Sequence, residues 1–231
     1  MGSAIPGWLT PVAWTYITLA LIATAVIAAD IYLGRRRHPD TASELVWITT
    51  GLYLGPFAIP VYVSRGRTSV STGSTVTATH TTAHTDADKT DAAVVAVLPG
   101  GGASAVAHLV AVPFVAAIGW TIAGMAMWPM IFVIAVLVTV MLFVHERLAG
   151  RSAGRTRLTA GAAVFAAVAT VAAFDIGMVG WMLLLYVNDA MPEVSDATFW
   201  FLMQVGVLVG LATGYPAVKW LLSRNQSVVP A

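Results

Sequence analysis

Two long runs without charge near the C-terminus limit the folds that are open to this chain. Residues 158–187 hold a single charged side chain, Asp175, and residues 198–218 hold none. A helix of about 20 apolar residues crosses the hydrocarbon core of a bilayer, so each run is long enough to span a membrane. The polar, acidic stretch between them contains Pro192, which favours a turn. The two runs therefore predict a hairpin of transmembrane helices.

Four further apolar segments extend this hairpin to an all-α, polytopic membrane bundle in a single domain, residues 1–231. The predicted helices cover residues 12–33, 45–63, 104–122, 128–144, 158–187 and 198–222. As one helix, residues 92–144 would be about 80 Å long, so they must turn back, and Gly124 and Pro129 mark the turn. Residues 92–102 are then predicted to be an interfacial lead-in.

Breakers and polar stretches interrupt this pattern in three places. Gly55 and Pro56 should kink or break the second predicted helix near its middle. Residues 64–91 are rich in Thr, Ser and Asp and poor in large apolar residues, which predicts a flexible loop. Asp30, near the end of the first predicted helix, is expected to pair with the arginines at 35–37 at headgroup level.

Composition excludes several classes of protein. The chain of 231 residues is 58% hydrophobic and only 10% charged, whereas a soluble domain carries about 25% charge. A net charge of +1 provides no basic face for nucleic acid. The absence of cysteine excludes disulfides, thiolate metal sites and cysteine catalysis. We expect a multi-pass protein of the plasma (cytoplasmic) membrane whose main partner is the lipid bilayer.

The distribution of Lys and Arg predicts orientation, because cytoplasmic loops are enriched in both. With six helices and both termini in the cytoplasm, only the arginines at 35–37 lie outside, a split of nine against three. Five helices with an external N-terminus give the same split. The length of the run at 92–144 favours six. The basic stretch at 145–157 is predicted to be a cytoplasmic loop.

Asp175 is the main candidate for a functional group, because a carboxyl group near the bilayer midplane usually faces a protein interior or a water-filled cavity. Met178 and Met182 follow on the same helical face, and Met203 and Gln204 lie on the last predicted helix. These five residues are the candidate substrate or ion site. Two interpretations stay open: an ion or proton path through Asp175, and a protonated Asp175 that only joins helices.

Gly206, Gly210 and Gly214 form a ridge of small residues on the last helix, which predicts close approach of another helix backbone. Metal ligands are weakly indicated. His80 and His84 lie in the polar loop, and His108 lies in the third helix. His108 with Met178, Met182 and Met203 would suit Cu(I), although methionines at this spacing more often pack. No cofactor is predicted.

Two stretches resemble a family of small bacterial and archaeal membrane proteins, the domain of unknown function numbered 4396. Residues 174–182 read FDIGMVGWM, similar to FEIGMFGWM in the family. Residues 199–206 read FWFLMQVG, similar to FWFMMQIG, and the likeness continues to Pro216. The family also carries THCGAGCTLGD in its third helix, where residues 107–117 read AHLVAVPFVAA. Only His108 remains, so any thiol or soft-metal chemistry of that motif is lost here.

Three functions compete on this sequence. A small transporter or ion- or proton-handling protein would use Asp175. A structural or accessory subunit, as a homo-oligomer or in a membrane complex, would use the glycine ridge. A copper-type metal-handling protein would use the methionines and His108. An enzyme is disfavoured, because the sequence contains no nucleophile–base pair or phosphate loop that we recognise.

Overall fold

The computed structural model describes residues 5–38, 40–67, 86–152 and 160–223, and all regular secondary structure within these ranges is helical. Six segments of the described chain are long and apolar enough to cross a membrane. The predicted class, an all-α bundle of apolar membrane helices, is therefore confirmed.

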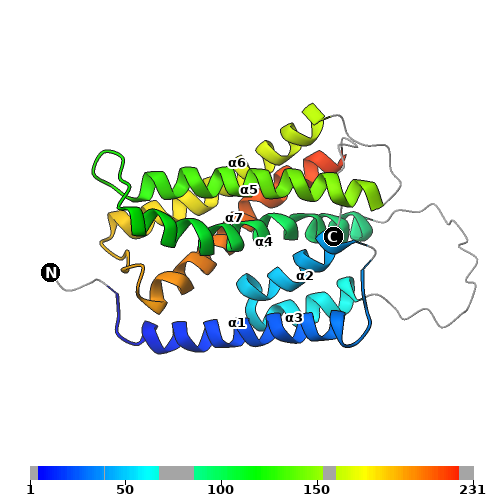
Figure 1. Cartoon of the computed structure of the whole chain (residues 1–231), viewed down its shortest axis with the longest axis horizontal. Coiled ribbons are helices and arrows are strands. Elements are labelled where there is room, and N and C mark those ends of the chain that lie inside the picture. Colours follow the sequence, from blue (N-terminus) through cyan, green and yellow to red (C-terminus); the bar gives the residue numbers. More distant parts are fainter. Residues whose placement is uncertain (1–4, 39, 68–85, 153–159, 224–231) are drawn as a thin grey trace, which may run out of the picture.

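Five long helices lie side by side along the long axis of the molecule (Figure 1). They are α1 (Leu9–Tyr32), α4 (Asp86–Ile118), α5 (Met127–Ser152), α6 (Ala160–Val187) and α7 (Ala197–Ser223). Helices α4 to α7 share one apolar core, and α1 packs on α7 and on the second apolar segment. The chain turns back between α4 and α5 at Gly119 and Gly124, which both have a positive φ.

The second apolar segment folds back on itself as a helical hairpin, residues 41–66. It consists of α2 (Thr41–Leu54), a 3₁₀ turn η1 (Gly55–Phe57), the short α3 (Ala58–Val61) and a π-helical turn η2 (Tyr62–Gly66). Gly55 has a φ of +57°, a conformation open mainly to glycine, and the next residue, Pro56, has no N–H to continue a helix. The break expected at these two residues is thus a reversal of direction.

Contacts between its two arms show that the hairpin returns to the end at which it began. The Tyr62 ring packs edge-on against Trp47 at 5.8 Å, and a Cβ on Gly66 would meet the same indole. The return arm lies beside α1 and ends near its last turn (Figure 1). The tip, at Leu54 and Gly55, reaches the middle of the bundle.

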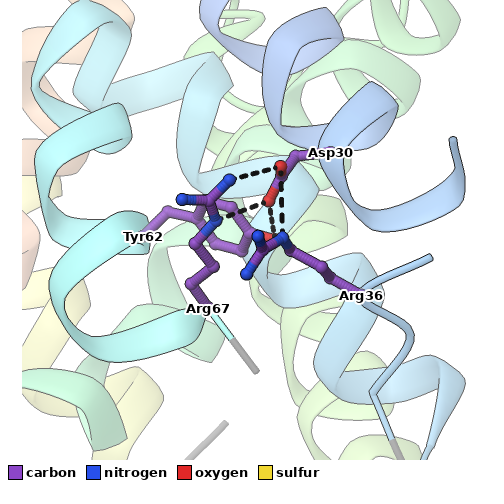
Figure 2. Close-up of polar contacts among 4 residues, drawn as sticks. All are labelled: Asp30, Arg36, Tyr62 and Arg67. Atoms are coloured by element: carbon purple, nitrogen blue, oxygen red, sulfur yellow. Dashed lines mark hydrogen bonds and ion pairs between the residues drawn. The ribbon is translucent and has the colours of Figure 1, made fainter. Parts of the chain in front are cut away.

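An ion cluster holds the base of the hairpin to the end of α1 (Figure 2). The Arg67 guanidinium donates from Nη2 to Asp30 Oδ1 at 2.9 Å and from Nε to Oδ2 at 3.2 Å. The Tyr62 hydroxyl donates to Oδ2 at 3.0 Å, and Arg36 Nε lies 3.6 Å from Oδ1. Asp30 therefore pairs with one arginine of the expected group, Arg36, and also with Arg67 from the far arm of the hairpin.

A second set of contacts fixes where α2 begins. Asp40 accepts a hydrogen bond from Ser43 N at 2.8 Å and so caps the helix. The Glu44 carboxylate, 1% exposed, accepts from Arg37 Nε and from the backbone N–H of His38. The basic turn after α1 is thereby tied to the first arm of the hairpin.

Helices α4 and α5 are longer than the sequence indicates. Residues 92–102, expected to be an interfacial lead-in, are helical, and Pro99 to Gly102 are buried. A Cβ on Gly101 would meet the Tyr53 ring and one on Gly102 would meet Thr49, so these glycines allow α2 to pack closely. Helix α5 likewise continues to Ser152, into the stretch expected to be a loop. His80 and His84 lie outside the described residues.

Helices α1 and α7 run in the same direction through the bundle (Figure 1). Tyr16, near the start of α1, packs edge-on against Phe201, near the start of α7, at 5.4 Å. The first residue of α1 and the last residue of α7 consequently lie at opposite ends of the bundle. Of the six apolar segments, only the hairpin begins and finishes at the same end.

Candidate functional site

The glycine ridge of α7 faces α6 within the chain. A Cβ on Gly206 would meet Met178 and Trp181, and one on Gly210 would meet the Phe174 ring. These neighbours are side chains, whereas the ridge was expected to meet a helix backbone. Gly214 is closer to that expectation, since a Cβ there would lie 3.8 Å from the backbone of Phe174.

Methionines 178 and 182 are part of this packing. Met178 is 3% exposed and Met182 is 4% exposed, and both belong to the core that α4 to α7 share. Trp181, between them on α6, donates from Nε1 to Leu202 O at 2.8 Å and sets the register of α6 on α7. The two methionines therefore fill space between helices.

Asp175 lies on the flank of α6, away from Gln204. It is half-buried, between Phe174, which packs on Gly210, and Ile176, which is 73% exposed. Gln204 lies on α7 near the level of Trp181, six residues and so about 9 Å further along α6 from Asp175. Among the described residues, no hydrogen bond or ion pair to Asp175 is formed. Asp175 therefore does not join helices through a hydrogen bond to any of these residues.

A cavity of about 390 Å³ lies instead between α1, α4 and α7, beneath the tip of the hairpin. It is lined by Trp14, Ile17, Ala20, Leu21, Leu52, Ala105, His108, Leu109, Ser195, Ala197, Trp200, Met203, Gln204 and Val207. Leu52, from α2, and Ser195, in the turn before α7, are both part of this lining. The cavity thus occupies the half of the bundle that the hairpin leaves free.

Two buried polar atoms in the lining have no hydrogen-bond partner among the described residues: His108 Nε2 and Gln204 Oε1. The His108 ring, 4% exposed, is held by Nδ1, which lies 2.8 Å from the carbonyl oxygen of Ser104. Because a carbonyl oxygen only accepts, Nδ1 carries the proton of the neutral ring and Nε2 presents a lone pair. His108 and Gln204 both line the cavity, while these two atoms are buried against the protein beside it.

The rest of the lining is apolar or aromatic and carries no charged side chain. Trp200 turns its ring to the cavity while its Nε1 donates to Val194 O at 3.0 Å. Met203 adds a thioether to the same lining. His108 and Met203 thus line the same cavity, although they lie on helices that are distant in the sequence. Within the described ranges, no three His, Asp or Glu side chains are grouped to hold a metal ion.

A second cavity, of about 300 Å³, lies near the other end of the bundle between α2, α4 and α5. Its walls are almost wholly apolar and include Val46, Val106 and Met141. Its polar lining residues are Thr41, Thr49 and the buried His145.

From the sequence, Met203 was grouped with Gln204 and Asp175 in one hypothesis and with His108 in another, but His108 and Gln204 were not brought together. His108, Met203 and Gln204 lie on two helices that are distant in the sequence, and the cavity between them depends on the hairpin, which stops half-way. The aromatic walls, Trp14 and Trp200, were missed because tryptophans near helix ends are ordinarily explained by the membrane interface.

Helices and cavity together define a polytopic α-helical membrane protein with a largely apolar cavity between α1, α4 and α7. The family model Domain of unknown function (DUF4396) matches residues 91–226, more than half of the chain, and the chain belongs to this family. The match covers α4 to α7, whereas α1 and the hairpin precede it. No curated protein and no solved structure matches the chain.

Proposed function

We propose that this protein is a small membrane transporter whose substrate site is the cavity between α1, α4 and α7. The observation that carries the proposal is the cavity of about 390 Å³, whose largely apolar lining includes the polar side chains of His108 and Gln204. Pockets that are largely apolar with a few convergent polar groups are typical ligand sites.

The proposal includes an orientation: the start of α1 outside the cell, the end of α7 in the cytoplasm, and five crossings, with the hairpin dipping in from the cytoplasmic face. The hairpin returns to the end of the bundle at which it began. One side of the membrane therefore holds the segments after α1, after the hairpin, between α5 and α6, and at the end of α7. Those segments contain all 12 Lys and Arg residues of the chain. The charge split becomes twelve to none, in place of nine to three, which strongly favours this side as cytoplasmic. The arrangement replaces the expected six crossings with both termini inside.

In this orientation the cavity opens to the outside. Ser195 lies in the turn between α6 and α7, and Trp14 lies near the start of α1. His108 is ten residues from the end of α4, so its depth is about 15 Å. The cavity thus runs from the outer surface toward the midplane, where Leu52 of the hairpin tip separates it from the cytoplasm.

Cysteine accessibility tests this function, and the chain has no native cysteine to interfere. Ala105→Cys, in the cavity lining, should react with an impermeant methanethiosulfonate added outside intact cells. Ala166→Cys, whose side chain would be buried between helices, is the control and should not react. An unreactive Ala105→Cys protein would show that the cavity is closed to water and would overturn the proposal.

Transport, unlike binding alone, requires that the inner end of the cavity be reached from both sides. Leu52→Cys should therefore react from outside in cells and from the cytoplasmic side in inverted vesicles. Reaction from outside only would make the cavity a receptor or accessory site. The alternative of a structural subunit loses one support, because the ridge of Gly206 and Gly210 is covered by α6. The alternative of copper handling loses two candidate ligands, because Met178 and Met182 pack between helices.

Asp175 enters the proposal as a proton-handling group separate from the cavity. A half-buried carboxyl group in an apolar helix, without a described partner, is costly to retain for structure alone. Asp175→Asn keeps the shape but cannot exchange a proton. We expect the variant to fold with unchanged thermal stability and unchanged labelling of Ala105→Cys. Labelling of Leu52→Cys from the cytoplasmic side should fall, and equal labelling in both proteins would remove Asp175 from the proposal.

A further inference from the structure

We propose that the second cavity, between α2, α4 and α5, is a binding groove for an anionic phospholipid, with an acyl chain between these helices and the headgroup phosphate at Arg147. The inference goes beyond the proposed function and does not depend on it. It follows from the shape of the groove, from its apolar walls, and from the position of Arg147 at one end of it.

The groove is open along one side to the outside of the bundle. Helices α2 and α5 both pack on α4 and touch each other at few residues, so α4 forms the floor and the other two helices form the walls. Leu45 on α2 and Val140 on α5 are each more than half exposed, and Met141 and Val144 are exposed beside them. In a membrane this surface meets lipid tails, so an acyl chain enters the groove sideways from the bilayer.

The lining suits an acyl chain because it is apolar and makes few polar demands. Val46 from α2, Val106 from α4 and Val140 from α5 line it on three sides, and no Asp, Glu, Lys or Arg is among the lining residues. The Thr49 hydroxyl donates to the carbonyl oxygens of Leu45 and Val46 within its own helix. The volume of about 300 Å³ is roughly ten times that of a water molecule, and a methylene group is of similar size. Part of one acyl chain therefore fits.

The groove also lies at the depth of an acyl chain. Its lining on α5 ends at His145, which is also the last residue of the apolar span of that helix. Thr41, at the start of α2, lines the same end of the groove. The rise along α5 from Val140 to Arg147 is about 10 Å, less than half of the roughly 30 Å hydrocarbon core. The groove thus extends inward from headgroup level and stays within one leaflet.

Arg147 supplies a positive charge at the headgroup end of the groove. It follows Val144 by three residues and Val140 by seven, so it lies on the face of α5 that lines the groove. Its side chain is exposed, and the guanidinium lies 5.3 Å from the centroid of the Phe143 ring. Among the described residues, no carboxylate forms an ion pair with Arg147. A guanidinium in this position can bind a phosphate group through two parallel hydrogen bonds.

The charge of the lipid follows from the absence of such a carboxylate. An anionic headgroup neutralises Arg147, whereas a zwitterionic headgroup brings a cation of its own. The arginines at the base of the hairpin differ in this respect, because Arg36 and Arg67 lie against Asp30, and Arg37 lies against Glu44. In the orientation proposed above, this end of the bundle faces the cytoplasm, and the cytoplasmic leaflet is the one that is rich in anionic lipids.

Native mass spectrometry of the purified full-length protein in detergent tests the inference, because it resolves each bound lipid molecule. The probes are phosphatidylglycerol and phosphatidylcholine with identical acyl chains, so that they differ in headgroup charge alone. The first molecule of phosphatidylglycerol should bind about fivefold more tightly than the first molecule of phosphatidylcholine, as expected for one arginine near the membrane surface.

Two pairs of variants separate the headgroup from the acyl chain. Arg147→Gln should lower the affinity for phosphatidylglycerol to that for phosphatidylcholine. Lys219→Gln, which removes an exposed cation near the end of α7 at the same end of the bundle (Figure 1), should not. Val140→Trp, whose indole would occupy the groove, should weaken binding of both lipids. Val168→Trp, at an exposed position of α6, should weaken neither. Thermal midpoints and size-exclusion profiles identify any variant that fails to fold, and the comparison of the two lipids in the parent protein needs no variant.

Three results would each overturn the inference: equal affinity of the parent for the two lipids, an unchanged ratio in Arg147→Gln, or unchanged lipid binding by Val140→Trp. A dimer that Val140→Trp separates and Val168→Trp does not would make the groove an interface between two copies of the chain, and this would also overturn it. None of these results bears on the cysteine labelling of the first cavity, so the proposed function stands or falls separately.

Discussion

At the scale of single residues, two glycines of the helix pair α6–α7 differ in whether a close contact requires the small residue. Gly210 and Gly180 lie on neighbouring helices and look alike in the sequence. A Cβ on Gly210 would come within 2.7 Å of the Phe174 ring, whereas one on Gly180 would meet nothing within 4 Å. Phe174 is itself 4% exposed and has little space into which it can move. Only Gly210 is thus required to be small.

Gly210→Leu should destabilise the protein by about 2 kcal/mol or more, because the added side chain overpacks the interface between α6 and α7. The measurement is the thermal midpoint in detergent, followed by size-exclusion chromatography. Gly180→Leu is the matched control and should change the midpoint little. Equal stability of the two variants would show that the glycine ridge does not pack closely against α6.

At the scale of the element, the hairpin depends on one backbone conformation and one ion cluster. Gly55 combines a positive φ with a close neighbour, since a Cβ there would lie 3.1 Å from the Tyr16 ring. The Tyr16 hydroxyl donates to Tyr53 O at 2.8 Å and satisfies a carbonyl that the broken helix leaves free. At the base, Arg67 and Tyr62 both bind Asp30. Tip and base are thus fixed by α1.

Gly55→Ala should lower stability by about 1–3 kcal/mol, the usual cost of a non-glycine residue in such a conformation. Gly100→Ala is the control, because Gly100 has no positive φ and no atom within 4 Å of an added Cβ. If the hairpin closes the inner end of the cavity, Gly55→Ala should also increase labelling of Leu52→Cys from the cytoplasmic side. Unchanged stability and labelling would mean that the reversal does not depend on this glycine.

At the scale of the whole molecule, the hairpin decides whether the chain crosses the membrane an even or an odd number of times. Six apolar segments with six crossings would return the chain to its starting side. In the proposed topology, five crossings by α1, α4, α5, α6 and α7 place the start of α1 and the end of α7 on opposite sides. The proposal gathers every Lys and Arg on one side and opens the cavity to the other. The proposed orientation therefore depends on a single local reversal.

Four single cysteines test this topology: Gly7→Cys, Thr41→Cys, Ser64→Cys and Ser195→Cys, all at exposed positions. An impermeant maleimide added to intact cells should label Gly7→Cys and Ser195→Cys. Thr41→Cys and Ser64→Cys, one in each arm of the hairpin, should react only after permeabilisation. Six crossings would put Thr41 and Ser64 on opposite sides, so labelling of just one of them from outside would contradict the hairpin.

By itself the sequence determined the class of this protein, because the free energy of burying an apolar run in a bilayer depends on length and composition alone. It also determined that the second apolar segment breaks at Gly55 and Pro56, since both residues act locally. Whether that break was a kink or a reversal was decided only by tertiary structure. The deciding contacts, Asp30 with Arg67 and Trp47 with Tyr62, join residues that are distant in the chain. The cavity was decided in the same way, because its lining residues on α1, α4 and α7 are distant in the chain and surround one space only where the hairpin stops half-way.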